Sequence, residues 1–285
     1  MGWEIGFIFL VIFGIGSSFL TKALTDVLPK KTLGIFYQFL FSAMLALAYV
    51  LFSGGFSFDI SAVIIGFMGI FNAIASYYFW KATESSLSQT TLFLPLVDIV
   101  AVILALIILR EAKTLNPLEI VGIALCFVSM GIFKSSYAAK NKTQSRWLYY
   151  IFVIVIIGGV STFLLKIFSS TVSHQTFLAS WYGGSFLGSI FLMITLKENP
   201  LSLELKNVFV IFPLSICVVG ALLALYRVFE LGGSVSVVLP LKNIFGTIIP
   251  IFIGWFFFHE NKKFVIEEYI AFALGILGII FILII

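Results

Sequence analysis

Long apolar runs, separated by short polar segments, dominate the pattern of the chain. The runs are continuous rather than alternating, and each is long enough to cross a bilayer as a helix of about 20 residues. Helices satisfy their own backbone hydrogen bonds in lipid, and the strands of a membrane barrel would alternate instead. The pattern therefore predicts an all-α integral membrane protein with ten transmembrane helices. The predicted helices cover residues 3–21, 32–53, 59–80, 87–109, 117–134, 147–168, 174–196, 207–229, 234–258 and 264–284.

The composition supports a membrane protein. Of the 285 residues, 61% are hydrophobic and only 11% are charged, whereas a soluble domain carries about 25% charged residues. This balance excludes a cytosolic enzyme, a nucleic-acid-binding protein and a disordered chain. The net charge is +4, and the basic residues stand at the ends of apolar runs, where they anchor helices at the membrane surface. Cys126 and Cys217 both lie within apolar runs, so no disulfide framework is expected.

The two halves of the chain resemble each other. Residues 14–22 align without gaps on residues 158–166, sharing glycine, two hydroxyl residues, Phe, Leu and a final Lys. Residues 94–99 (LPLVDI) align on 239–244 (LPLKNI). The pair Arg110-Glu111 corresponds to His259-Glu260, each just past the end of a predicted helix. These positions predict an internal repeat.

The polar segment 134–146 lies between the two halves and predicts their boundary. The expected organisation is a first five-helix repeat at 1–137, a polar linker at 138–146 and a second five-helix repeat at 147–285. Because five helices is an odd number, the second half enters the membrane from the other side. Two inverted five-helix repeats around a midplane site are typical of secondary transporters.

The order of these features resembles the drug/metabolite transporter superfamily, in its EamA-like branch. The features are the two five-helix halves, the hydroxyl-rich first helix that ends at Lys22, and the fourth helix with Pro95 followed by a Glu. The resemblance implies a multi-pass protein of the cell membrane that moves small organic metabolites by alternating access, with export of amino acids or related solutes as the expected activity. A lipid-linked sugar flippase component and a sugar-uptake carrier of the same superfamily are the alternatives, together with a non-transporting partner subunit. In the small multidrug resistance relatives a Glu is embedded in the first helix. Residues 13–15 here are Phe, Gly and Ile, so that proton-exchange mechanism is not carried over.

Asp98 is the only carboxylate near the middle of a predicted span, where polar groups are costly and usually functional. Thr91 and Pro95 share its helix face at spacings of four and three. The corresponding stripe on the ninth helix consists of Ser236, Pro240, Asn243 and Thr247, with Lys242 beside it. We expect the two stripes to face each other. Asp98 then binds a substrate amine or a coupling proton and Lys242 an anionic group, or the two form a structural ion pair.

Other polar and aromatic residues are candidates for the walls of a substrate cavity. These candidates are Ser17, Ser18, Asn72, Ser76, Trp80, Ser161, Thr162 and Tyr226. Small hydroxyl residues also serve helix packing, and aromatic residues such as Trp181, Tyr182 and Tyr226 also form membrane-interface belts, which is the favoured interpretation. Lys22 and Lys166 are expected to extend to the interface. Pro95, Pro240 and Pro250 are candidate hinges.

No metal-ligand cluster, phosphate-binding loop or nucleophile–base pair is evident in the sequence. We therefore expect no enzyme activity, no metal and no cofactor. The expected partners are a small-molecule solute and the lipid bilayer, with the protein a monomer or a weak homodimer. The positive-inside rule puts the linker in the cytoplasm and both termini outside, whereas the resemblance implies cytoplasmic termini; we follow the charges.

Overall fold

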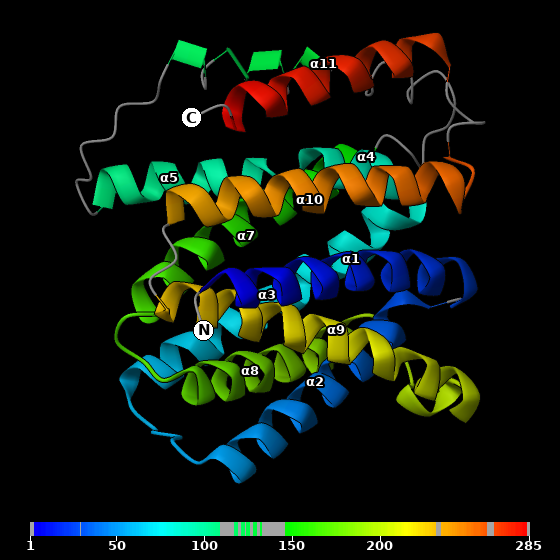
Figure 1. The fold of residues 1–285 in the computed structure, drawn as a ribbon. Helices are drawn as coiled ribbons and strands as arrows, with labels where there is room; N and C mark the ends of the chain where they lie inside the picture. Colours follow the sequence, from blue (N-terminus) through cyan, green and yellow to red (C-terminus); the bar gives the residue numbers. More distant parts are fainter. Residues whose placement is uncertain are drawn as a thin grey trace.

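The computed structural model describes residues 3–28, 30–108, 146–231, 235–260 and 265–283, together with separate positions between 117 and 132. Within these residues every regular element is a helix, and the helices lie side by side in one bundle (Figure 1). The helices are α1 (Trp3–Val27), α2 (Lys31–Ser53), α3 (Ile60–Ser85), α4 (Leu87–Phe93), α5 (Leu96–Ile108), α7 (Trp147–Phe168), α8 (His174–Thr195), α9 (Leu205–Glu230), α10 (Val235–Phe256) and α11 (Ile266–Leu283), with a 3₁₀ turn η2 (Pro200–Ser202) before α9.

Six of these helices are long and apolar enough to cross a membrane, namely α1, α2, α3, α7, α8 and α9. Large apolar side chains also cover the outside of the bundle. Phe52 is 93% exposed, and Phe67 and Phe209 are more than half exposed. A water-soluble protein does not expose contiguous apolar surface of this kind. The chain is therefore a multi-pass membrane protein.

The helices overlap the predicted spans, but α1 continues six residues beyond its predicted end at 21 and α3 five residues beyond its predicted end at 80. Only about half of the fifth span, 117–134, lies within the described residues, and the polar linker 138–146 lies outside them except for Arg146. The fourth span, 87–109, was expected to be one helix but is two, because Pro95 has no N–H to continue the helix. The Leu94 N–H instead bonds to the Thr91 carbonyl at 3.3 Å, and α5 begins at Leu96.

The two ends of the bundle differ. We call the end to the right in Figure 1 the charged end. The helices that finish there are α1, α3, α8 and α10, and those that begin there are α2, α4, α7, α9 and α11. At the opposite end, α1 and α10 begin and α9 finishes.

Glycines bring α3 and α8 into direct backbone contact. A Cβ atom placed on Gly184 would lie 1.8 Å from the Gly66 carbonyl oxygen, and one on Gly69 would lie 2.2 Å from the Trp181 carbonyl oxygen. No larger side chain fits at either position. The small residues Gly184 and Gly188 of α8 therefore form a helix-packing surface, as is usual between membrane helices.

Two buried apolar clusters hold the bundle together. The first joins α1, α2, α3, α8 and α9 around Phe39, Trp80 and Phe177. The second joins α4, α7, α10 and α11 around Phe93 and Trp147, whose rings meet edge to face at 5.6 Å. The first cluster surrounds the cavity described next.

Candidate functional site

A cavity of about 220 Å³ lies between α1, α2, α3, α8 and α9. Its walls carry the neutral polar residues Ser17, Thr21, Gln38, Asn72 and Ser76, the aromatic residues Phe39, Phe79, Trp80, Trp181 and Tyr182, and the aliphatic residues Val218 and Leu222. We call this space the central cavity.

The structure brings four of the predicted wall residues together. Ser17, Asn72, Ser76 and Trp80 come from two helices and all line the central cavity. Their helical spacings, such as the four residues between Asn72 and Ser76, placed them on one face, and the packing of α3 against α1 and α8 turned that face inward.

Eight further wall residues were not among the sequence-based candidates, and two of them, Thr21 and Gln38, are neutral polar residues. Thr21 lies one turn beyond Ser17 on the same face of α1, and Gln38 is a polar residue within an apolar run, so both carried a usable signal. Trp181 and Tyr182 were expected to belong to an interface belt. The packing of α8 against α2 and α3 buries both in the cavity wall, which agrees with the alternative that they stack on a ligand, and that role stays a prediction.

Internal hydrogen bonds fix the amide side chains of the central cavity. The Trp80 Nε1–H donates to Gln38 Oε1 at 3.1 Å, and the Asn72 Nδ2–H donates to Ser185 Oγ at 3.0 Å. The Ser215 hydroxyl donates to the Gln38 backbone carbonyl at 2.9 Å. The Gln38 carbonyl oxygen and the Asn72 NH₂ group are therefore each hydrogen-bonded to a neighbouring helix.

The Gln38 NH₂ group and the Asn72 side-chain carbonyl oxygen have no hydrogen-bond partner within the described part of the chain. The same is true of the Thr21 and Ser76 hydroxyl groups, which belong to the same cavity wall. Gln38 and Thr21 are only 4% and 3% exposed. These groups are therefore open to hydrogen bonds with water or a solute in the cavity.

The two expected stripes on α5 and α10 do meet, at a place separate from the walls of the central cavity. Asn243 Nδ2–H donates to Asp98 Oδ2 at 2.5 Å, and Lys242 Nζ lies 3.3 Å from the same oxygen. Asp98 and Asn243 are buried. The Thr247 hydroxyl donates to the Thr91 carbonyl at 3.4 Å and extends the contact to α4.

This geometry agrees with the ion-pair alternative for Asp98 and Lys242. The roles of Asp98 as a solute-binding group or coupling-proton site stay predictions. The candidate hinges Pro240 and Pro250 lie within the continuous helix α10, whereas Pro95 marks the break between α4 and α5. Ser236 lies in α10, and its side chain and that of Pro240 fall outside the described residues.

The other predicted wall residues do not line the central cavity. The Ser18 hydroxyl donates to the Gly14 carbonyl at 3.1 Å, and Tyr226, fully buried, donates to the carbonyls of Phe168 and Val172. The Ser161 hydroxyl is buried without a partner in the described structure, and Thr162 is half-buried on α7.

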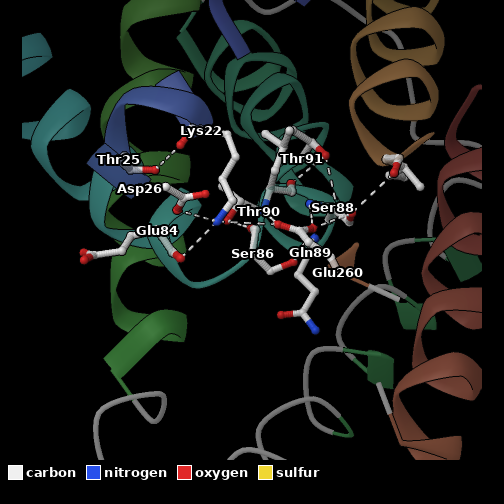
Figure 2. Close-up of polar contacts among 12 residues, drawn as sticks. Lys22, Thr25, Asp26, Glu84, Ser86, Ser88, Gln89, Thr90, Thr91 and Glu260 are labelled. Atoms are coloured by element: carbon white, nitrogen blue, oxygen red, sulfur yellow. Dashed lines mark hydrogen bonds and ion pairs between the residues drawn. The ribbon is translucent and has the colours of Figure 1, made fainter. Parts of the chain in front are cut away.

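A second polar cluster lies at the charged end and is built around Glu260 (Figure 2). The Glu260 carboxylate accepts the backbone N–H groups of Leu87 and Ser88 at 2.7 and 2.9 Å. It also accepts the hydroxyls of Ser86 and Ser88 at 2.9 and 2.6 Å. The first N–H groups of a helix lack partners within the helix, so Glu260 caps α4.

Lys22 lies on the other side of this carboxylate. Its ammonium group is 3.8 Å from Glu260 and donates to Asp26 at 3.1 Å and to the Glu84 carbonyl at 3.2 Å. Lys22 is only 6% exposed. Its ammonium group is thus held by these acceptors at the charged end of the bundle, and the expectation that it extends to the interface stays a prediction.

A neighbouring lysine completes the cluster. Lys31 lies 3.3 Å from the Glu84 carboxylate and donates to the Leu28 carbonyl at 2.8 Å. Gly254 makes room for the arrangement, since a Cβ there would lie 2.2 Å from Ser88 Oγ and 2.7 Å from Glu260. The sequence had pointed to Glu260 only as a repeat counterpart of Glu111. We call Lys22, Lys31, Asp26, Glu84 and Glu260 the end cluster.

The described residues contain no group of His, Cys, Asp and Glu side chains that could hold a metal ion.

Comparisons with known proteins give a fold and no family. No protein-family model matches the chain, and no curated protein matches it. A solved structure titled "Crystal structure of protein" is similar, with a TM-score of 0.61 and 15% sequence identity over 95% of each chain. At this identity the likeness is one of fold alone, and it extends over nearly the whole chain.

Proposed function

We propose that the protein is a secondary transporter that moves small organic metabolites across the cell membrane by alternating access. The observation that carries the proposal is the central cavity, a polar space inside a bundle of apolar helices. Asn72 lies halfway along α3 and Ser17 just past the middle of α1. Thr21, Gln38 and Trp80 lie nearer the charged end, so the lining extends from the middle of the bundle toward that end. Transporter sites occur near the bilayer midplane, between helices.

The packing of the helices supports an inverted-repeat origin for this site. In the proposed repeat, α1, α2, α3 and α4–α5 correspond to α7, α8, α9 and α10. If each helix is replaced by its repeat partner, the α1–α9 contact becomes the α7–α3 contact, which is also observed. In the same way the α3–α8 contact becomes the observed α9–α2 contact. The pairs α2–α8 and α4–α10 map onto themselves. Since α1 begins at the opposite end and α7 at the charged end, the relation is antiparallel.

This arrangement is the one expected from the resemblance to EamA-like drug/metabolite transporters. Two halves that rock against each other would expose the central cavity first to one side and then to the other. Closure at the charged end is attributed to the end cluster, which joins α1, α2, α3, α4 and the segment after α10.

Transport assays in proteoliposomes test the proposal directly. The purified protein is supplied with a panel of amino acids, sugars and other small metabolites, with and without a pH gradient. Ser76→Trp, which fills the central cavity, should reduce the rate at least tenfold, while Ser53→Trp at the exposed end of α2 should not. Equal rates in protein-free liposomes and proteoliposomes for every solute contradict the proposal. Movement of a lipid-linked sugar alone supports the flippase alternative instead.

The coupling role of Asp98 has its own test. If Asp98 carries the coupling proton, Asp98→Asn abolishes the effect of a pH gradient on transport, because the amide cannot exchange a proton. Lys242→Gln serves as the comparison that removes the partner but keeps the carboxylate. Unchanged gradient dependence in Asp98→Asn means that the proton is carried elsewhere, and the pair is then structural.

A further inference from the structure

The walls of the central cavity carry no formal charge, and this limits what can bind there. The side chains that line it are neutral polar, aromatic or aliphatic. Lys22, which follows the wall residue Thr21 in the chain, is bound by Asp26, Glu260 and the Glu84 carbonyl. An ion buried without a countercharge loses several kcal/mol of solvation that nothing replaces. The cavity is therefore unfavourable for ions.

The polar lining offers both kinds of hydrogen-bonding group in fixed positions. Because Trp80 occupies the Gln38 carbonyl oxygen, the Gln38 NH₂ group remains as a donor. Because the Asn72 NH₂ group donates to Ser185, the Asn72 carbonyl oxygen remains as an acceptor. The hydroxyls of Thr21 and Ser76 can act as either. A bound molecule with matching donors and acceptors would satisfy groups that are otherwise unpaired.

The rest of the wall is aromatic. Trp181 and Phe79 lie among the lining residues together with Trp80 and Tyr182. Aromatic walls favour molecules with a ring whose faces are apolar and whose edge is polar. The lining thus favours binding of a compact ring-shaped molecule over a flexible chain with charged ends.

We infer that the central cavity binds small uncharged ring solutes that carry both donors and acceptors, and discriminates against ions and zwitterions. This inference rests on the proposed transport function and narrows its substrate class. The chemistry is shared by nucleobase-like and hexose-like molecules, and the experiment separates the two.

Matched pairs of probes that differ in charge provide the test on the unmodified protein in nanodiscs. The pairs are nicotinamide and nicotinate, uridine and uridine monophosphate, and glucose and glucuronate. In at least one pair the neutral member should bind at least tenfold more tightly than the charged member, and leucine and choline should not compete. Preference for nicotinamide or uridine indicates a nucleobase-like solute, and preference for glucose indicates a hexose-like one.

Two variants locate the binding in the central cavity. Gln38→Leu and Asn72→Leu should each weaken binding of the neutral probe about three- to tenfold, the loss expected for one neutral hydrogen bond. Gln175→Leu, a change of the same kind outside the cavity wall, should leave it unchanged. Equal effects of all three variants contradict the assignment.

Failure of the inference can be told from failure of the transport proposal. Equal or tighter binding of the charged probes, or transport of amino acids without transport of neutral rings, overturns the inference and leaves the transporter intact. No binding and no transport of any solute in the panel overturns both.

Discussion

At the scale of single residues, Glu260 connects more parts of the molecule than any sequence pattern suggested. Its carboxylate caps α4 and faces the Lys22 ammonium group of α1. The position of a carboxylate just past an apolar run is visible in the sequence, but its partners lie more than 170 residues away. Such contacts depend on how α10 packs on α4, which periodicity does not encode.

Replacement of Glu260 should destabilise the protein strongly. Glu260→Gln removes the charge that faces Lys22 and weakens the bonds to the Leu87 and Ser88 N–H groups, so the free energy of unfolding should fall by about 2–4 kcal/mol. Thermal unfolding in detergent measures the change. Glu267→Gln, on an exposed position of α11, is the matched control and should have little effect.

A double-variant cycle isolates the ion pair from the cap. Lys22→Met should destabilise the wild-type protein more than it destabilises the Glu260→Gln variant, because the second background has already lost the opposite charge. Additive effects would mean that Lys22 depends on Asp26 and the Glu84 carbonyl alone.

The residues of the central cavity also show that sequence spacing predicts a helix face but not the helix that packs against it. Asn72 and Ser76 could be placed on one helix face from their spacing, and Asp98 could be matched with Asn243 from the repeat. Gln38 stands out as one polar residue in an apolar run, which marks it as a candidate but does not show which neighbouring helix it faces.

At the scale of helices, glycines decide which elements approach closely. The contact of α3 with α8 depends on Gly66, Gly69 and Gly184, where added side-chain atoms would collide with backbone. The small-residue face of α8 was visible in the sequence. The identity of its partner was not, because several helices carry glycines at similar spacing.

Two adjacent glycines of α8 provide a sharp comparison. Gly184→Ala should lower the free energy of unfolding by about 1–3 kcal/mol, since its Cβ would lie 1.8 Å from the Gly66 carbonyl oxygen and the helices must separate. Gly183→Ala meets nothing within 4 Å and should be neutral or slightly stabilising. Thermal unfolding of both variants in the same detergent is the measurement, and equal stability would contradict the direct backbone contact.

At the scale of the whole molecule, the order of the described apolar helices followed from the sequence, and the count of ten spans stays a prediction. Hydropathy identifies helices well because lipid requires continuous apolar segments. It does not identify the break at Pro95, because proline is tolerated inside other spans, as at Pro213 of α9. The arrangement of helices around the central cavity also required the structure, since it is set by side-chain fit between neighbours.

The distribution of positive charge predicts the orientation in the membrane. The described basic residues near the charged end include Lys30, Lys31, Lys81, Lys197 and Lys206, and those toward the opposite end are Lys166 and Arg227. The positive-inside rule places the charged end in the cytoplasm. A reporter fused after residue 285 should then be active as a periplasmic phosphatase and inactive as a cytoplasmic fluorescent protein in a bacterial host. A reporter inserted in the segment 134–146 should give the reverse result, and the opposite pattern would favour the orientation implied by the resemblance.

The interruption at Leu94 and Pro95 has a mechanical consequence. Helix α4 is hydrogen-bonded to Glu260 of the end cluster. Helix α5 carries Asp98, which is hydrogen-bonded to α10. If α4 and α5 were one continuous helix, it would move as a rigid body, and a shift of the Asp98 contact would break the contact with Glu260. Because the helix is interrupted between them, α5 can tilt together with α10 while α4 keeps its bonds to Glu260. Movement around Asp98 therefore need not break the end cluster.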